Sequence, residues 1–294
     1  MKKLFFSAAL LFAAVLPSFS QRVAVLNGPS SIPCAYLMEE NPEYDYETFA
    51  SAQLALPKLI KGEADFGFLP PNVAAKIYTE NKGAVLCLGI CGNGNLFLLT
   101  KDGSFSDLKQ LEGKTAACAG QGATPEYIMN YIFEKKGIKN VTLDFSTPNA
   151  QIVPALLSGK FDYAIVPEPF ASVAESKDSG IKKISISKEF ASISNGNDFP
   201  MTVLVVNKKY AEKHKKETAD FIKKYEGAVA RTLKNPHEAA ELAEKHNLGL
   251  TKEIAEKAIP NCAFVFTPAK KSKAQIEQLL KLFGQKLPDS KFYY

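Results

Sequence analysis

The sequence predicts an α/β fold of two lobes, each a mostly parallel sheet flanked by helices, joined by two hinge crossings. Three observations predict it: a repeated segment, apolar strands that alternate with helical segments, and two Gly- and Asn-rich interruptions at 92–95 and 195–198. The chain has 294 residues, of which 46% are hydrophobic and 23% charged. These values are typical of a globular protein, and the length fits two lobes.

The repeat covers residues 56–70 and 153–167. Five residue pairs recur at one offset of 97 positions: Pro57/Pro154, Leu59/Leu156, Gly62/Gly159, Asp65/Asp162 and Pro70/Pro167. Each copy predicts a helix, a Gly that ends it, a turn Asp and a buried strand. We expect Pro57 and Pro154 in the first helical turn, where the missing N–H has no intrahelical partner.

The elements follow the same order in both lobes. The first lobe has predicted strands at 23–26, 44–49 and 66–69, and the second has them at 115–119, 141–145 and 163–166. Helical segments separate the strands, so each lobe is a β-α-β-α-β unit, and its right-handed crossovers make the neighbouring strands parallel.

The remaining segments give the domain division. Strands are predicted at 84–90, 96–100 and 201–206, beside the two interruptions, and helices near 216–234, 236–246, 252–258 and 272–283. We expect this helical tail to pack on the first lobe. The predicted division is a signal peptide at 1–20, a first lobe at 21–94 and 206–294, and a second lobe at 95–205.

The first 20 residues have the pattern of a secretory signal peptide. Lys2 and Lys3 give a basic start, an apolar run covers 4–16, and small residues precede the cleavage point after Ser20. We therefore expect a periplasmic mature chain. No Cys stands at the cleavage point, so no lipobox is expected, and no later apolar run is long enough to span a membrane.

Charge and side-chain chemistry exclude several classes of function. The net charge is +5, but Arg occurs only at positions 22 and 231, and no basic stretch carries stacking aromatics, so nucleic acid is not an expected partner. The five Cys suggest no disulfide framework, and the three His all fall in the Lys- and Glu-rich C-terminal part. We expect no catalytic residue, no metal ion and no cofactor.

The chain resembles a known family. It is similar to the type II periplasmic solute-binding proteins of ABC importers, in the group that serves sulfonates, taurine, nitrate and pyrimidine precursors. The resemblance spans the mature chain and rests on five segments: Leu26–Ser30, Gly120–Tyr127, Pro167–Phe170, Ala258–Cys262, and the ending 286–294 with Lys-Leu-Pro and Phe-Tyr-Tyr. It implies capture of a small polar or anionic metabolite in an interlobe cleft, hinge closure, and delivery to permease and ATPase subunits. We expect a monomer.

Eleven residues near the expected cleft are candidate ligand contacts: Asn27, Ser30, Ser31, Pro71, Asn72, Asn95, Gln121, Gly122, Ala123, Thr124 and Glu168. In open α/β sheets, ligands collect at the carboxyl ends of the strands. Amides at helix starts favour a carboxylate, sulfonate or phosphate. Glu168 would instead accept hydrogen bonds from N–H, O–H or cationic groups, and no Arg is expected nearby to clamp an oxyanion. Ordinary helix capping explains the Ser, Thr and Asn residues about as well.

Two other hypotheses stay open. The same fold can carry an exported or repurposed enzyme of the pyrimidine-precursor or menaquinone-pathway type, and an exported sensor subunit would look alike. The signal peptide and the lack of a His- and Cys-rich active loop favour a binding protein over an enzyme.

Overall fold

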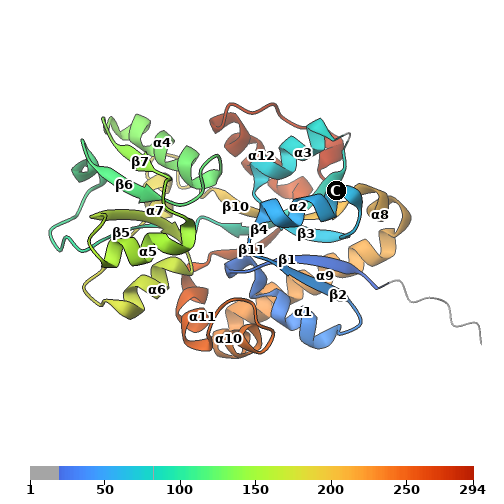
Figure 1. The fold of residues 1–294 in the computed structure, drawn as a ribbon. Helices are drawn as coiled ribbons and strands as arrows, with labels where there is room; N and C mark the ends of the chain where they lie inside the picture. Colours follow the sequence, from blue (N-terminus) through green and yellow to red (C-terminus); the bar gives the residue numbers. More distant parts are fainter. Residues whose placement is uncertain (1–19, 82) are drawn as a thin grey trace, which may run out of the picture.

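Two sheets form the frame of the molecule (Figure 1). The computed structural model describes residues 20–81 and 83–294, so the predicted signal peptide, apart from Ser20, lies outside the described residues. The first sheet has six strands in the order β11-β4-β10-β3-β1-β2, and the second has five in the order β7-β6-β8-β5-β9. Helices cover both sheets, which lie side by side as two lobes.

The first lobe begins with the elements of the predicted β-α-β-α-β unit. They are β1 (Arg22–Leu26), α1 (Cys34–Glu40), β2 (Asp45–Phe49), α2 (Ala52–Lys61), β3 (Phe66–Leu69), α3 (Pro71–Glu80) and β4 (Val85–Asn93). The second lobe contains β5 (Leu96–Thr100), β6 (Thr115–Cys118), α4 (Thr124–Lys136), β7 (Thr142–Asp144), α5 (Asn149–Leu157), β8 (Tyr163–Pro167), α6 (Phe170–Lys177), β9 (Lys182–Ser185) and α7 (Ile186–Ala191).

The chain then returns to the first lobe. It forms β10 (Pro200–Asn207), α8 (Lys208–Lys213), α9 (Lys215–Lys234), α10 (Pro236–Lys245), α11 (Lys252–Ala258), β11 (Phe264–Pro268) and α12 (Ala269–Leu282). Strand β10 pairs with β3 and β4 in the six-stranded sheet. Residues 200–205 therefore lie in the first sheet, although the predicted second lobe extended to 205. The rest of the domain division stays a prediction.

The sheets are mixed rather than mostly parallel. The strands of each repeated unit are parallel, as predicted, because helical crossovers connect them: β1 with β2 and β3, and β6 with β7 and β8. The strands added around these units are antiparallel. Strand β10 runs against β3 and β4, and β5 runs against β8 and β9. Strands β4, β5 and β10, which flank the two crossings, thus pair in the antiparallel direction.

The repeat is visible in the structure, but the position expected for its prolines is wrong. Pro57 and Pro154 are each the sixth residue of a helix, α2 and α5, and not part of the first turn. Each therefore leaves the carbonyl four residues earlier without its helical partner. The helices still end as predicted, with Gly62 (φ 73°) directly after α2 and Gly159 (φ 77°) two residues after α5.

Each sheet is covered by apolar side chains on both faces, as its alternation of strands and helices requires. On one face of the first sheet Phe66 stacks on Phe221 of α9 with ring centroids 3.9 Å apart. The chain ends on the other face: Phe292 and Tyr293 are buried, and the Tyr294 amide donates to the Cys87 carbonyl at 3.0 Å. The Phe-Tyr-Tyr ending thus anchors the C-terminus to β4.

The helical tail packs mainly on the first lobe, but α12 also reaches the second. Leu279 and Phe283 belong to the core of the second lobe, and Phe283 stacks on Tyr127 of α4 with centroids 4.2 Å apart. Gln275 of α12 donates to Asn93 Oδ1 at 3.4 Å and to the Asp198 carbonyl at 3.1 Å. Helix α12 therefore contacts both lobes and both connections between them.

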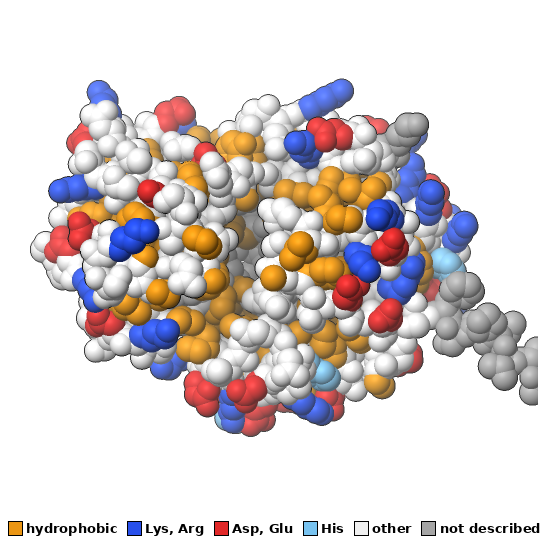
Figure 2. Space-filling view, in the orientation of Figure 1, with side chains coloured by type: hydrophobic (Ala, Val, Ile, Leu, Met, Phe, Trp, Pro, Cys, Tyr) orange, Lys and Arg blue, Asp and Glu red, His pale blue; other side chains and the backbone are white. Residues whose placement is uncertain are grey.

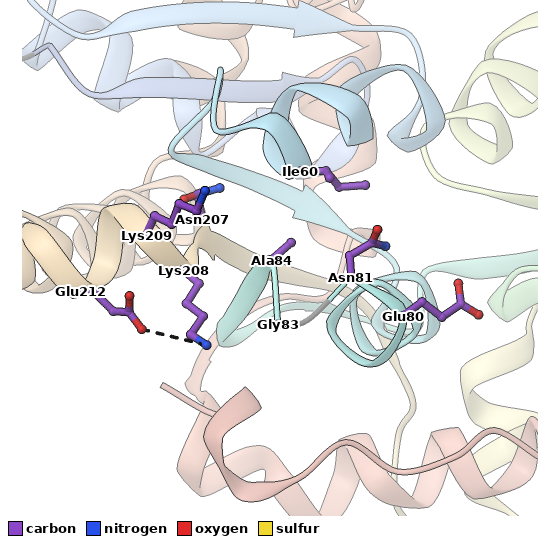
Figure 3. A pocket seen from close by; sticks show the side chains of 9 residues that line it. All are labelled: Ile60, Glu80, Asn81, Gly83, Ala84, Asn207, Lys208, Lys209 and Glu212. Carbon is purple, nitrogen blue, oxygen red and sulfur yellow. Dashed lines mark ion pairs between the residues drawn. The ribbon is translucent and has the colours of Figure 1, made fainter.

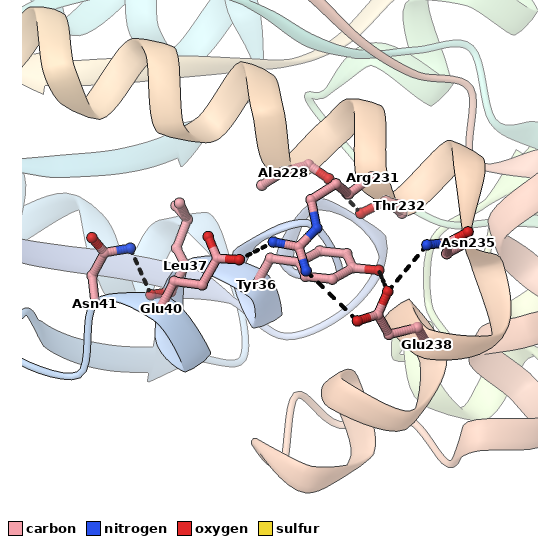
Figure 4. Close-up of polar contacts among 9 residues, drawn as sticks. All are labelled: Tyr36, Leu37, Glu40, Asn41, Ala228, Arg231, Thr232, Asn235 and Glu238. Atoms are coloured by element: carbon pink, nitrogen blue, oxygen red, sulfur yellow. Dashed lines mark hydrogen bonds and ion pairs between the residues drawn. The ribbon is translucent and has the colours of Figure 1, made fainter.

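A polar network around Arg231 joins α1 to α9 and α10 (Figure 4). The guanidinium lies 4.0 Å from the Tyr36 ring centroid and pairs with Glu40 and, at 3.6 Å, with Glu238. The Tyr36 hydroxyl donates to Glu238 Oε2 at 3.0 Å. Burial, together with this carboxylate, raises the pKa of Tyr36 to about 12. Helix α1, which follows the first candidate binding loop, is held to the tail by this network.

We expect Arg231→Ala to lower the free energy of unfolding by about 1 kcal/mol, since half-exposed ion pairs and one cation–π contact contribute little individually. Urea denaturation measures the change. Arg231→Lys keeps the charge but loses the planar contact with Tyr36, so its loss should be smaller. Equal stability of Arg231→Ala and the wild type would contradict this account of the network.

Among residues 20–81 and 83–294, no helix combines the length and apolar character needed to cross a bilayer. The five Cys are all buried and free.

Candidate functional site

The candidate binding loops of the two lobes face one another across a furrow, visible in Figure 2. Within it lies a small recess with a volume of about 10 Å³. Its lining comes from the loop after β1, the first crossing, β10 and the segment before β11, namely Pro29, Ser30, Cys91, Gly92, Asn93, Asn95, Met201, Thr202, Cys262 and Phe264. This volume holds about one water molecule, so a solute can enter only if the lobes move apart.

Asn95 is the candidate with the clearest place in the recess. Its side chain is only 8% exposed and lines the recess, and its Oδ1 has no hydrogen-bond partner. Its carbonyl accepts the Glu168 amide at 2.9 Å, so the first crossing and the end of β8 lie together. A buried amide oxygen without a partner is costly, and a ligand donor would satisfy it.

A second set of candidates meets where α3 and α4 begin. Asn72 Nδ2, from the first lobe, donates to the Gly122 carbonyl of the second lobe at 3.2 Å. Asn72 Oδ1 and Thr124 Oγ1 are buried and have no partner. The sequence predicted that these loops face each other, and this contact brings them together.

The expected anion seat at the start of α4 is already occupied by a side chain of the same helix. The Gly122 amide donates to Glu126 Oε2 at 2.7 Å, which places a carboxylate at the positive end of the helix. Sequence reasoning missed this role of Glu126, although an acidic residue in the first turn is a known helix-start signal. An incoming oxyanion would have to displace Glu126.

Glu168 is 1% exposed at the start of α6. Its Oε2 accepts the Ser172 amide at 3.0 Å, and Oε1 has no hydrogen bond but lies 3.5 Å from Lys183 Nζ. Lys183 in turn pairs with Glu175 at 2.6 Å. Burial raises the pKa of Glu168, against the opposing effects of the Ser172 amide and Lys183. Glu168 is thus a capping carboxylate whose second oxygen faces the ammonium group of Lys183.

This burial predicts a pH-dependent effect of Glu168→Gln. Burial holds the folded-state pKa of Glu168 above the ordinary 4.5, so the native state stays protonated to a higher pH than the unfolded chain. Ionisation of Glu168 therefore lowers the free energy of unfolding as the pH rises through the folded-state pKa. We expect the variant to be more stable than the wild type at pH 7 and equally stable below pH 4.5. Urea denaturation across this range measures it, and a variant less stable at pH 7 would contradict it.

The other candidates have more ordinary positions. Ser31 is buried and donates its hydroxyl to the Gly28 carbonyl at 2.5 Å, as a local cap does. Ser30 lines the recess and is half-buried. Of the eleven candidates, Ser30 and Asn95 are the two in the lining. Among the other nine, Asn27 and Gln121 are exposed, Ala123 is half-buried, and Pro71 is buried as the first residue of α3.

The two crossings are packed tightly against each other. Ser187 Oγ donates to the Gly94 carbonyl at 2.6 Å. A Cβ at Gly94 would clash with Ser187 Oγ and would lie 2.6 Å from Asp198 Oδ1 and 2.8 Å from Phe199 Cζ. Burial raises the pKa of Asp198, whose Oδ1 accepts the Phe199 amide at 2.8 Å. Only Gly fits between the crossings at position 94.

Larger cavities lie at the opposite end of the first lobe. One has a volume of about 530 Å³ and is lined by residues around the start of β4 and the end of β10, with the Lys208–Glu212 pair among them (Figure 3). A neighbouring one, around Arg22 and Asp65, has a volume of about 470 Å³. Neither contains a candidate ligand residue. In the described part of the chain, no group of three or more His, Cys, Asp or Glu side chains is placed to hold a metal ion.

Lys183, Thr202 and Cys262 are among the residues near the site that were not predicted. Thr202 and Cys262 line the recess. Burial raises the pKa of the Cys262 thiol, and the nearby carboxylate of Glu168 adds to this effect, so the segment before β11 lies near the end of β8. Cys262 belongs to a segment on which the family resemblance rests, and this membership could have pointed to it as a site residue. No sequence feature pointed to Lys183.

Two α/β lobes that meet over a polar recess are the arrangement of the substrate-binding proteins of ABC transporters. A model of the NMT1-like family matches residues 39–246, and the chain belongs to that family. The chain is 24% identical over 196 residues to YtlA of Bacillus subtilis (strain 168), described as a candidate binding protein. That match covers 64% of this chain and 56% of the length of YtlA.

Solved structures share the fold. An ABC transporter protein from Parabacteroides distasonis is 26% identical with a TM-score of 0.76, over 94% of this chain and 98% of that one. The periplasmic aliphatic sulphonate binding protein SsuA from Escherichia coli is 16% identical with a TM-score of 0.72, over 90% and 86%. The predicted two-lobe fold and the resemblance to the binding proteins of ABC transporters are confirmed. Family and neighbours are binding proteins, consistent with a protein that is not an enzyme.

Proposed function

We propose that this protein captures a small polar solute in the recess between its lobes, closes on it by a hinge motion, and delivers it to the permease and ATPase subunits of an ABC importer. In this proposal, residues 1–20 are removed on export and the mature protein works as a periplasmic monomer. The observation that carries it is the set of buried, unpartnered polar atoms on the loops that meet at the furrow, on Asn72, Asn95, Thr124 and Glu168.

Hinge closure is supported by how the lobes are connected. Only short crossings at Gly94 and near Asp198 link the two sheets through the chain, and Gln275 of α12 bonds to both. The lobes also contact each other directly, through Asn72 and Gly122. A solute that bonds to both lobes makes more contacts when the lobes are closed. It therefore binds the closed state more tightly and shifts the equilibrium toward it.

Mass spectrometry of the protein purified from its own cells tests the proposal. We expect one small molecule per chain, released unchanged when the protein is unfolded. The stripped protein should have a larger radius of gyration in small-angle X-ray scattering than the refilled one. A chemically altered product would favour the enzyme hypothesis, and a radius that does not change on refilling would contradict hinge closure.

A further inference from the structure

Helix α12 divides its apolar side chains between the two lobes. Ala269, Ile276 and Leu280 belong to the core on one face of the first sheet. Leu279 and Phe283 belong instead to the core of the second lobe, and both are buried. Residues four apart lie on the same side of a helix, so the two sets form neighbouring stripes. Helix α12 therefore packs on each lobe with its own stripe.

The contact with the second lobe includes an aromatic stack. Phe283 stacks on Tyr127 of α4, with the ring centroids 4.2 Å apart and the ring planes inclined by 22°. Figure 1 shows α12 beside α3, on the side of the first lobe that faces α4. Neither Phe283 nor Tyr127 nor Leu279 lines the recess. These side chains therefore hold the lobes together without being part of the recess wall.

The stack lies at a distance from the crossings about which the lobes would rotate. Gln275, about two turns earlier on α12, bonds to Asn93 and to the Asp198 carbonyl, and so to both crossings. Phe283 follows eight residues later, which is about 12 Å along the helix. At that distance a rigid-body rotation of about 15° moves the rings apart by about 3 Å. The centroids would then be beyond the upper limit of about 7 Å for a ring pair, so opening breaks the stack.

We infer that Leu279 and Phe283 form a latch, which holds the second lobe on the first while the recess is closed and sets how readily the recess opens. This inference rests on the proposed function, because a latch matters only if the lobes move. Separation of the lobes exposes the apolar surface of Leu279, Phe283 and Tyr127 to water and ends the ring contact. The latch residues are positioning residues, since they act on a solute only through the angle between the lobes.

Two adjacent leucines of α12 provide a matched test. Leu279→Ala removes a latch side chain, whereas Leu280→Ala removes an equally buried leucine of the first lobe's core. Both should lower the melting temperature, since each leaves a cavity. The recess supplies the readout, because Cys91 and Cys262 line it and are 2% and 1% exposed. In the stripped protein we expect iodoacetamide to alkylate these two thiols at least about threefold faster in Leu279→Ala than in the wild type, and less than about twofold faster in Leu280→Ala, because alkylation tracks the open population.

A third thiol separates opening of the lobes from loosening of the fold. Cys118 lies in the core of the second lobe, is 1% exposed and does not line the recess. Peptide mass spectrometry resolves the three thiols, and the rate at Cys118 should stay unchanged in each variant. Tyr127→Ala removes the stack from the other lobe. It should speed alkylation in the recess as Phe283→Ala does, and the double variant should be no faster than either, because both remove one contact.

The opposite results overturn the latch. Equal recess rates in Leu279→Ala and the wild type would do so, as would equal acceleration by Leu279→Ala and Leu280→Ala. Acceleration that includes Cys118 would show that the fold loosens as a whole, and would overturn it as well. Each of these outcomes leaves the proposed solute capture standing. The lack of any solute in the protein purified from its own cells would instead count against the proposed function, whatever the thiol rates show.

Discussion

We expect Gly94→Ala to lower the free energy of unfolding by about 2 kcal/mol, because the added methyl has no room between the two crossings. It would clash with Ser187 Oγ and approach the buried Phe199 ring to 2.8 Å. The Ser187 hydroxyl cannot move without losing its bond to the Gly94 carbonyl. Overpacking of this kind costs about 1 to 3 kcal/mol. Urea denaturation measures the loss, and solute affinity should fall as well, because the crossings set the angle between the lobes.

Gly92→Ala is the matched control on the same crossing. Its new Cβ would meet only Thr202 Cβ, at 4.0 Å, which is ordinary van der Waals contact. We expect a change in stability within about 0.5 kcal/mol. Equal losses for the two variants would show that the tight packing at position 94 has no special cost.

The second large effect is expected from Asp65→Ala. Asp65 is 2% exposed and accepts three hydrogen bonds from Arg22, from the amide at 2.9 Å, from Nε at 3.1 Å and from Nη2 at 2.6 Å. These bonds hold the starts of the parallel strands β1 and β3 together. Removal of the carboxylate leaves the Arg22 donors unpaired. Because the guanidinium is 41% exposed and water can reach it, we expect a loss of about 2 kcal/mol rather than more.

Asp162→Ala is the control given by the internal repeat. Asp162 has the same place before β8 that Asp65 has before β3, but its side chain is exposed. Its replacement should change the free energy of unfolding by less than about 0.5 kcal/mol. If Asp162→Ala lowered the free energy of unfolding as much as Asp65→Ala, then neither the burial of Asp65 nor its pairing with Arg22 would explain the loss.

The repeat explains why much of the fold could be predicted. Short apolar runs that mark buried strands, and a Gly after each helix, are local sequence signals. Strands such as β1, β3 and β8 therefore begin and end within a residue or two of their predicted ranges. The mixed direction of the sheets could not be predicted the same way. The strands β5 and β10 find their partners through long-range pairing, and no residue within them encodes that choice.

The candidate site was predicted less well than the fold. Strand ends indicated these loops as candidates, and Asn72, Asn95, Thr124 and Glu168 are buried in them. The pattern could not separate a ligand contact from a cap, and Ser31 has the bonding of a cap. The role of α12 was beyond prediction, because Tyr127 and Phe283 meet across 156 positions of sequence with no shared motif.

A crystal structure of the protein with its copurified solute tests the central claim most directly. We predict that the solute lies in the recess, bonded to Asn95 and Glu168, with both lobes in contact. A solute seated in the large cavity beside Lys208, at the far end of the first lobe, or one that touches a single lobe only, would contradict it.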